Sequence, residues 1–484
     1  MRKKFLFAIL LVVVFCFCSP VAPVAAGKTE LVTTTRDQTG VSVTIYNRNL
    51  ALVKDRRELD LPQGEINLAF REISARIKPE TSILSGSGVS VIEQNFEFDL
   101  LTPESLLKKY VGRKVEVITR HPTSGQETRR SARVLSANQG VVLQFNDKHI
   151  ETGVPGRLSF SGIPENLRDR PTLTMLVSNP QAGKKSLELS YLTSGLGWKA
   201  DYVAELNAQD TKLNLSGWVT LTNTSGATYR QARLQLVAGD VNQVPPEMEL
   251  NDRNMRFQVS KAMATPTPNM AQEEMFEYHL YTLGRPTTIA DRQTKQVALL
   301  QAAAVPCRKE FVLRGGSYYY NQPYRKASGM KEKIGVFVEI ENRREDHLGM
   351  PIPAGVVRVY KEDSGKNLQF IGEDRIDHTP ENEKIRLHLG DAFDLTATRK
   401  QTDFKKIRGD GRYNYTYEAA FELKLKNAKD QSVEIKVVEP VPGDWKIISE
   451  SLPHKKESSN SAVWRVNIPA KGEQMLTYRT RVRF

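Results

Sequence analysis

The sequence predicts an all-β protein. Apolar and polar residues alternate with a period of two along many short segments, and residues that favour turns separate these segments. Helical segments long enough to cover a parallel sheet are missing. We therefore expect two antiparallel β-sandwich units, with a small SH3-like or Sm-like barrel inserted in the first and a Pro-rich linker between them.

The first 26 residues are expected to form a cleaved secretory signal. Arg2, Lys3 and Lys4 precede an apolar run over residues 5–18, and small residues lead up to Ala26. The apolar run is shorter than the roughly 20 residues of a membrane-spanning helix, and no later stretch qualifies. We predict a mature chain that starts at Gly27, has no transmembrane helix and is periplasmic or secreted.

The predicted N-terminal β domain covers residues 27–243. Val41, Val43 and Ile45 alternate with polar neighbours, and the segment from Trp198 to Leu206 repeats this pattern. Between them, a short helix from Pro103 leads into about five strands that end near residue 160. This pattern is typical of a small SH3-like or Sm-like barrel, predicted here at about 101–160. We interpret it as a spacer or a protein-contact unit.

A linker is predicted over residues 244–304, where Pro, Met, Gln and Asn replace the alternation. Apolar and aromatic residues return at 274–283, so this part is expected to dock on a sheet. A C-terminal β-sandwich is predicted over 305–484. Its last strand is expected to bury Leu476, Tyr478, Val482 and Phe484 against the strand that contains Phe421 and Leu423.

Charge and cysteine content narrow the class of partner. The formal net charge is +13 over 484 residues, and removal of the three basic signal residues leaves +10 over 458. Outside the cytoplasm such an excess favours lipopolysaccharide, an acidic polysaccharide or an acidic protein rather than nucleic acid, and the alternative interpretation is an ordinary solvated surface. Of the three cysteines, Cys16 and Cys18 leave with the signal, so Cys307 can form no internal disulfide.

Four residues have the side chains that divalent metals prefer as ligands: Glu373, Asp374, Asp377 and His378. No third or fourth ligand in a fixed relation is visible nearby, and Asp and His before Thr379 also suit a turn between strands. The metal site is therefore one hypothesis and a structural turn the other. No catalytic residue and no cofactor are predicted.

Other motifs suit structural roles better than chemical ones. Ser105 and Lys108 match S-x-x-K but lack the companion motifs of the enzymes that use it. Arg308 could lower the thiol pKa of Cys307 if the sulfur were exposed, although a lone cysteine that enters a strand more often packs in a core. Aromatic faces suit sugar rings, so tryptophans could form a stacking platform, with Trp445 as the better surface candidate. The alternative for Trp445 is a loop tryptophan that closes the end of a sandwich. The four tryptophans are Trp198, Trp218, Trp445 and Trp464.

Several blocks in order resemble a known bacterial family, catalogued as domain of unknown function 4139. The blocks cover residues 191–198, 217–223, 236–240, 278–282, 348–355, 370–374 and 399–404. The resemblance implies an exported all-β protein with no established catalytic residues. The second half is more distantly similar to proteins named mucoidy inhibitors, which implies a link to envelope polysaccharide.

Three functional hypotheses follow. The first is a non-catalytic envelope protein that scaffolds or binds another envelope component, either a protein or an anionic polysaccharide. The second is a metal-dependent hydrolase of envelope material that uses the four residues from Glu373 to His378. The third is an outer-membrane β-barrel, suggested by the C-terminal Phe484 on an alternating strand.

Overall fold

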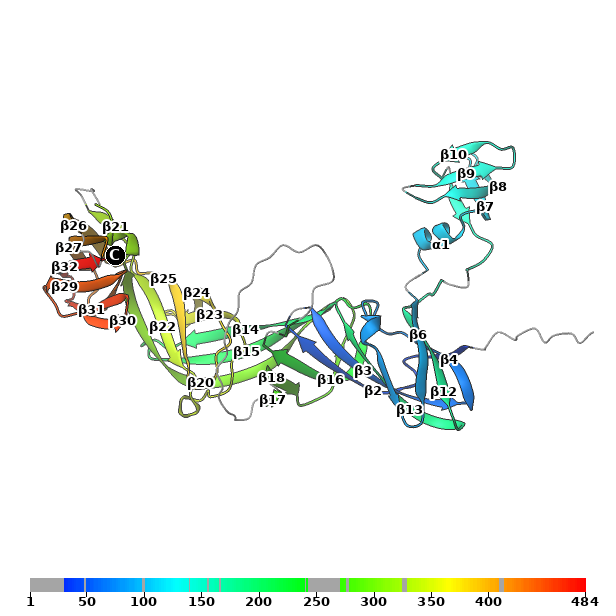
Figure 1. Cartoon of the computed structure of the whole chain (residues 1–484), viewed down its shortest axis with the longest axis horizontal. Helices are drawn as coiled ribbons and strands as arrows, with labels where there is room; N and C mark the ends of the chain where they lie inside the picture. The colour runs from blue at the N-terminus through cyan, green and yellow to red at the C-terminus, as the bar shows by residue number, and fades with distance from the viewer. Residues whose placement is uncertain are drawn as a thin grey trace, which may run out of the picture. The chain divides into compact units, whose positions relative to one another are not determined.

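The computed structural model describes residues 30–47, 49–97, 101–138, 140–154, 156–164, 167–239, 241–242, 270–275, 278–323, 329–408 and 413–484 (Figure 1). These residues form 32 strands, one α-helix and three short 3-10 helices, so the predicted all-β class is confirmed. The predicted signal peptide lies outside the described residues. The 3-10 helices are η1 (Pro79–Thr81), η2 (Ser317–Tyr320) and η3 (Arg344–Asp346).

The chain divides into two compact units. Unit 1 comprises residues 1–38, 57–73 and 84–187, and unit 2 comprises residues 39–56, 74–83 and 188–484. The domain boundaries expected near residues 243 and 305 stay a prediction. One strand, β20 (Gln293–Arg314), continues through residue 305.

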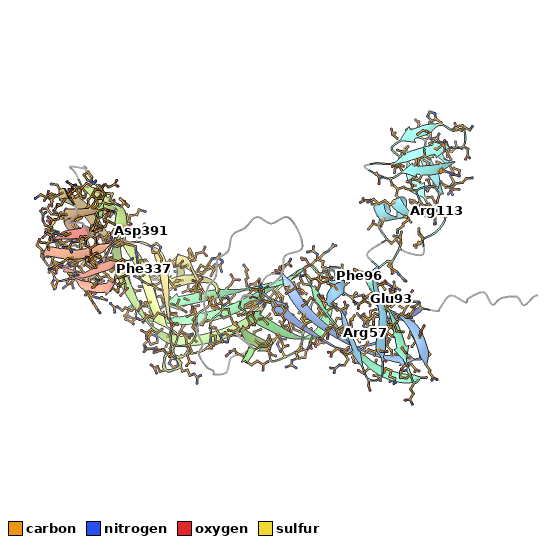
Figure 2. All side chains as sticks on the ribbon, in the orientation of Figure 1. Arg57, Glu93, Phe96, Arg113, Phe337 and Asp391 are labelled. Atoms are coloured by element: carbon orange, nitrogen blue, oxygen red, sulfur yellow. The ribbon has the colours of Figure 1, made fainter. Side chains whose placement is uncertain are left out.

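Unit 1 contains a four-stranded sheet with the order β1-β4-β12-β6. Arg57 is fully buried beside it (Figure 2), where its guanidinium donates to the carbonyl oxygen of Arg71 at 2.9 Å and lies 5.3 Å from the ring centroid of Phe70. These contacts satisfy a charge that burial would otherwise make costly. The strands are β1 (Glu30–Thr33), β4 (Gly64–Arg71), β6 (Ser90–Glu97) and β12 (Thr172–Asn179).

The inserted module, residues 101–160, is one α-helix and a five-stranded antiparallel sheet with the order β10-β9-β8-β7-β11. Its outer strands pair only with β9 and β7 in the part of the chain that the structure describes, so the sheet is not closed into the expected barrel. The module has its own core, which includes Tyr110, Val117 and Val134. Its elements are α1 (Pro103–Lys109), β7 (Lys114–Arg120), β8 (Glu127–Ser136), β9 (Val142–Phe145), β10 (Ile150–Thr152) and β11 (Arg157–Ser159).

A further sheet has the order β17-β18-β16-β2-β3-β13-β5, with β19 paired to β16. Its strands β17 and β18 come from the predicted linker, and β18 pairs with β16. The strands are β2 (Gln38–Tyr46), β3 (Leu50–Leu61), β5 (Ile83–Gly86), β13 (Gly183–Thr193), β16 (Tyr229–Ala238), β17 (Met270–Met275), β18 (Tyr278–Leu283) and β19 (Thr287–Ile289).

The largest sheet has the order β24-β23-β14-β15-β20-β28-β31-β30, with β22 and β25 branching from β20. Four strand pairs in the described chain are parallel, namely β1–β4, β2–β16, β14–β23 and β20–β28, so the sheets are mixed rather than purely antiparallel. The strands are β14 (Leu196–Leu206), β15 (Lys212–Asn223), β22 (Gly335–Glu341), β23 (Gly355–Glu362), β24 (Leu368–Ile376), β25 (Lys384–Asp391), β28 (Val433–Pro440), β30 (Lys455–Ser458) and β31 (Ser461–Ile468).

The C-terminal sandwich packs a five-stranded sheet, β21-β26-β27-β32-β29, against β28 and β31 through one apolar core. Leu476, Tyr478 and Val482 of β32 are buried, as predicted from their alternation. Phe484 is 41% exposed, so the prediction that it is buried is wrong: it follows the last residue of β32, and its ring lies against Tyr417 of β27, 5.7 Å between centroids, rather than in the core. The strands are β21 (Met330–Glu332), β26 (Leu395–Arg408), β27 (Tyr415–Asn427), β29 (Asp444–Glu450) and β32 (Glu473–Arg483).

Four buried asparagines occupy equivalent positions at strand ends. Asn179, Asn223 and Asn427 are the last residues of β12, β15 and β27, and Asn342 directly follows β22. Each side-chain amide nitrogen donates to two successive carbonyl oxygens of a distant turn, at 3.2 to 3.4 Å and at 2.8 to 3.0 Å. The acceptor pairs are Leu61 and Pro62, Ile289 and Ala290, Thr379 and Pro380, and Ile468 and Pro469.

The same local turn follows each acceptor pair. Two residues later the backbone is left-handed, at Gly64, Arg292, Asn382 and Lys471. The strand that leaves each turn then runs antiparallel to the strand that carries the asparagine. The asparagine amide supplies a donor to the carbonyls that precede each turn, and the Thr379 carbonyl oxygen also accepts from the Ile352 backbone nitrogen at 2.8 Å. One strand-and-turn arrangement therefore occurs four times among the residues that the structure describes.

Candidate functional site

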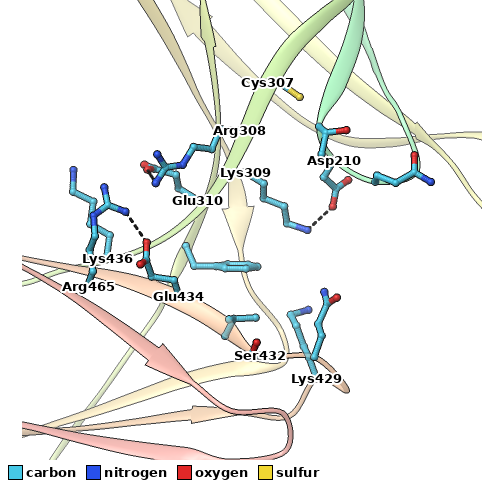
Figure 3. A pocket seen from close by; sticks show the side chains of 15 residues that line it. Asp210, Cys307, Arg308, Lys309, Glu310, Lys429, Ser432, Glu434, Lys436 and Arg465 are labelled. Atoms are coloured by element: carbon cyan, nitrogen blue, oxygen red, sulfur yellow. Dashed lines mark hydrogen bonds and ion pairs between the residues drawn. The ribbon is translucent and has the colours of Figure 1, made fainter.

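A pocket of about 460 Å³ in unit 2 brings together charged residues from distant parts of the sequence (Figure 3). One side is the turn between β14 and β15, where the Asn207 carboxamide oxygen accepts hydrogen bonds from the backbone nitrogens of Thr211 and Lys212. This turn places Asp210 beside Lys309 in the C-terminal part of β20. The lining residues are Gln209, Asp210, Thr211, Cys307, Arg308, Lys309, Glu310, Phe311, Lys429, Gln431, Ser432, Val433, Glu434, Lys436 and Arg465.

Two carboxylates in this pocket each bridge two cations. Asp210 accepts from Lys309 Nζ at 2.8 Å and also from Lys361. Burial alone would raise the pKa of Asp210, but the hydrogen bonds from the two lysines outweigh it, so its pKa lies below the usual value. Glu310, whose side chain is only 9% exposed, pairs with Arg308 at 3.1 Å and Arg386 at 3.5 Å. Each carboxylate thus leaves one positive charge unbalanced.

Phe311 lies between two lysines. The ammonium of Lys309 is 5.4 Å and that of Lys429 is 5.9 Å from its ring centroid, distances typical of cation–π contacts. Five basic and three acidic side chains line the pocket. Lys429 and Lys436 also pair with carboxylates outside the lining, Asp394 at 3.2 Å and Glu457 at 2.8 Å. With Lys361 and Arg386, the outside partners of Asp210 and Glu310, seven basic and five acidic side chains remain, an excess of two positive charges. We call the pocket, which Phe311 also lines, the Phe311 pocket.

The thiol of Cys307 lines the same pocket. Burial, with a smaller contribution from the negative charge of Asp210, raises its pKa from 9.0 to about 11. The thiol is therefore protonated at neutral pH, and the neighbouring Arg308 does not activate it. This agrees with the packing interpretation of Cys307 rather than with a reactive nucleophile.

The four candidate metal ligands lie on or just after β24, where each has a structural partner. Glu373 pairs with Arg358 at 3.2 Å, and Asp374 accepts from the backbone nitrogen of His388 at 2.7 Å. His378 Nδ1 accepts from the backbone nitrogen of Ala354 at 3.2 Å. The carbonyl oxygen of Asp377 accepts from the Thr379 hydroxyl at 2.9 Å, as expected in a turn.

Asp377 and His378 line a second pocket of about 600 Å³, whereas Glu373 and Asp374 do not. The ring of His388 packs on Phe337, 4.8 Å between centroids. Among the residues that the structure describes, no group of three or more His, Cys, Asp or Glu side chains is arranged to hold a metal ion. The metal site stays a prediction.

The tryptophans differ in exposure. Trp445 is only 8% exposed, because its ring packs in the C-terminal core and its indole nitrogen donates to the Ser459 carbonyl oxygen at 2.7 Å. Of the two roles expected for it, this burial agrees with a tryptophan that closes the sandwich rather than with a surface platform. Trp198 and Trp464 are also buried, whereas Trp218 on β15 is 41% exposed.

The S-x-x-K residues serve the helix of the inserted module. Ser105 exchanges hydrogen bonds with Thr102 in a capping box, and Lys108 pairs with Glu104 at 2.7 Å along the helix. Both contacts are standard ways of stabilising a helix, so neither residue is set up for nucleophilic chemistry.

A buried ionic network was missed by the sequence analysis. Arg399 of β26 is 3% exposed and donates to Glu439 at 2.6 Å, to Glu332 at 2.7 Å and to the Tyr478 hydroxyl at 3.1 Å. Tyr320 donates to Glu439 at 2.7 Å. All these groups are satisfied within the core, and their role is structural. Alternation alone could not identify this arginine, since basic residues on strands usually face solvent.

No described helix is long and apolar enough to cross a membrane. The fold and the pocket thus define an all-β protein of repeated sandwich-like units with a cation-rich pocket on unit 2. Residues 187–484 match the family described as Domain of unknown function (DUF4139), and the chain belongs to that family. No curated protein matches the chain. The more distant resemblance to mucoidy inhibitors stays a prediction.

Proposed function

We propose that this chain is an exported, non-catalytic binding protein of the bacterial envelope, and that the Phe311 pocket holds an acidic polysaccharide. The observation that carries the proposal is the excess of two positive charges around an aromatic ring. A buried or half-buried cation excess attracts anions more strongly than the same charges spread over a surface.

The chemistry of an acidic sugar complements this pocket. Its ring carbons would pack on the face of Phe311, while its carboxylate would accept from Lys309 and Lys429 on either side. The volume lies within the usual range for small-molecule sites. The protonated thiol of Cys307 favours binding over nucleophilic catalysis.

The binding test compares an acidic with a neutral polymer. We expect the chain from Gly27 to Phe484 to bind polygalacturonate in a calorimetric titration and not to bind dextran. Lys309→Gln should weaken binding by about tenfold, as expected for loss of one charge-assisted hydrogen bond. Asp210 keeps Lys361 as a partner, so this variant should fold.

Lys446→Gln provides the matched control, because Lys446 is exposed on β29 and does not line the pocket. It makes the same change in net charge and should bind like the parent chain. Equal binding of both polymers, or equal losses in the two lysine variants, would contradict the proposed site. Export is tested separately: protein recovered from the periplasm should begin at Gly27 by mass spectrometry.

A further inference from the structure

The inserted module carries a concentration of positive charge. Residues 101–160 contain ten Lys and Arg against five Asp and Glu, a net charge of +5 over 60 residues. The expected mature chain carries +10 over 458 residues, from the 484-residue total of +13 less the three basic signal residues. Half of the excess charge therefore lies in about an eighth of the chain, and this favours an anionic partner for the module.

Much of this charge lies on one face of the module sheet. Val115, Val117, Ala132 and Val134 point into the core on the side of α1, so the alternate residues of β7 and β8 point away from it. Arg157 and Ser159 of β11 extend this face by pairing with β7. We call it the basic face. Its charged and hydroxyl side chains are Lys114, Glu116, Arg120, Glu127, Arg129, Ser131, Arg133, Arg157 and Ser159, and Arg157 pairs with Glu127 at 2.9 Å.

Two cations on the basic face stand directly opposite each other. Lys114 of β7 is the cross-strand partner of Arg133 of β8, and both side chains are exposed. Neither has an ion pair within the described chain. Like charges in directly opposed positions destabilise a sheet, so this arrangement costs folding free energy unless an anion lies between them.

A shallow pocket of about 440 Å³ lies beside this pair. It is lined by Lys114 and by the serines Ser131, Ser159 and Ser161, which supply an ammonium and hydroxyl donors of the kind that bind phosphate. Glu116 also lines the pocket, but Arg129 pairs with it at 3.4 Å and offsets its charge. The pocket therefore suits a phosphate group rather than a cation.

Exposed aliphatic side chains border the same cations. Leu135 follows Arg133 by two residues on β8 and is 39% exposed. Ile150 of β10 is 54% exposed and lies opposite Gln144, which in turn lies opposite Arg133. The C–H face of a sugar ring packs on flat aromatic rings, whereas exposed aliphatic side chains beside cations suit a lipid interface, which accepts them among its headgroups.

We propose that the basic face of the inserted module docks on an anionic lipid surface, with Lys114 and Arg133 at lipid phosphates and Ile150 among the headgroups. The charge excess and the opposed cations provide the attraction, and the aliphatic border selects lipid over a soluble polyanion. This inference is independent of the Phe311 pocket, which lies in the other unit.

The test measures co-sedimentation of the chain from Gly27 to Phe484 with vesicles. We expect binding to vesicles that contain phosphatidylglycerol, no binding to vesicles of phosphatidylcholine alone, and a loss of binding as salt rises. The double variant Lys114→Gln with Arg133→Gln should bind on the order of 30-fold more weakly, since each basic residue near an anionic surface contributes roughly a fivefold factor.

Matched variants separate this inference from its alternatives. Lys109→Gln removes one charge from α1, on the covered side of the sheet, and should bind like the parent, as should Lys309→Gln in the Phe311 pocket. Ile150→Ser should weaken vesicle binding without removing charge. Failure to bind anionic vesicles, or an undiminished affinity of the double variant, would overturn the proposal. A second result would also overturn the proposal: Ile150→Ser binds vesicles as tightly as the parent chain, and soluble polygalacturonate displaces the parent chain from them. The basic face would then be assigned to a soluble polyanion instead.

Discussion

Asn342 shows how a single side chain can join two segments that are far apart in sequence. Its amide nitrogen donates to the carbonyl oxygens of Met350 at 2.7 Å and Pro380 at 2.9 Å, and its carbonyl oxygen accepts from the backbone nitrogen of Gly349 at 2.9 Å. The residue is fully buried, so water cannot replace these bonds. The repetition of this contact at three other strand ends indicates that it is a general device of this fold.

We predict that Asn342→Ala lowers the free energy of unfolding by about 2 to 4 kcal/mol, because several buried backbone groups lose their partner at once. Denaturation by guanidinium chloride measures the change. Asn414→Ala, at an exposed position, should change stability by less than about 0.5 kcal/mol. If Asn342→Ala were as stable as Asn414→Ala, the amide of Asn342 would contribute little to the free energy of unfolding.

The pKa of Cys307 gives a prediction for the pH dependence of thiol reactivity. Alkylation by iodoacetamide should be slow at neutral pH and should rise toward a midpoint near pH 11, whereas the unfolded chain should show a midpoint near 9. Because folding raises this pKa, the contribution of the thiol to stability is present below pH 9 and is lost as the pH rises through about 11. A folded-state midpoint at or below 9 would contradict the burial of this thiol.

At the scale of elements, the network around Arg399 joins five segments of the C-terminal sandwich. Arg399 lies on β26, Glu332 on β21, Glu439 on β28 and Tyr478 on β32, while Tyr320 belongs to η2. Burial raises the pKa of Tyr478, so its hydroxyl stays protonated and available as a partner. The network fixes the register of these elements through hydrogen bonds as well as apolar packing.

Arg399→Met is expected to destabilise the C-terminal sandwich by about 3 to 5 kcal/mol, because it leaves the carboxylate of Glu439 buried without its cation. Adding Glu439→Leu to this variant should recover part of the loss, since the unpaired charge is then removed. Thermal unfolding followed by circular dichroism measures both. The double variant could instead be less stable than Arg399→Met by the full cost of a second core substitution. Lost packing, rather than the unpaired charge of Glu439, would then account for the destabilisation.

At the scale of the whole molecule, the inserted module is held at its two ends. The backbone nitrogen of Leu101 donates to the carbonyl oxygen of Arg168 at 2.8 Å, and the flanking strands β6 and β12 pair with each other over their whole length. The chain therefore enters and leaves the module at neighbouring points. Removal of the module should leave these flanking strands paired.

We predict that replacing residues 101–160 with a short Gly-Ser linker leaves the remainder folded, with a cooperative thermal transition close to that of the parent chain. The module buries its own core and adds no strand to the four-stranded sheet of unit 1. Calorimetry of the shortened chain tests this expectation. Loss of cooperative melting would show that the module contributes to the core of unit 1.

Local alternation was enough to predict the all-β class and much of the C-terminal core. Leu476, Tyr478 and Val482 are buried as their period of two predicts, because side chains on a strand alternate between its two faces. The rule fails at Phe484, where the strand has ended, and at Arg399, where partners on other strands compensate a buried charge. At Trp445 the sequence left a surface position and a packed position open, and the structure buries the ring in the core.

The sequence by itself determined the class of fold, the family of the chain and the absence of a recognisable catalytic motif. Only the tertiary structure decided the parallel strand pairs, the four asparagine contacts and the Phe311 pocket. Lys361 reaches Asp210 across 151 positions of sequence, and Asn342 reaches Pro380 across 38. Such pairs depend on which strands become neighbours, and alternation within one strand carries no information about its neighbours.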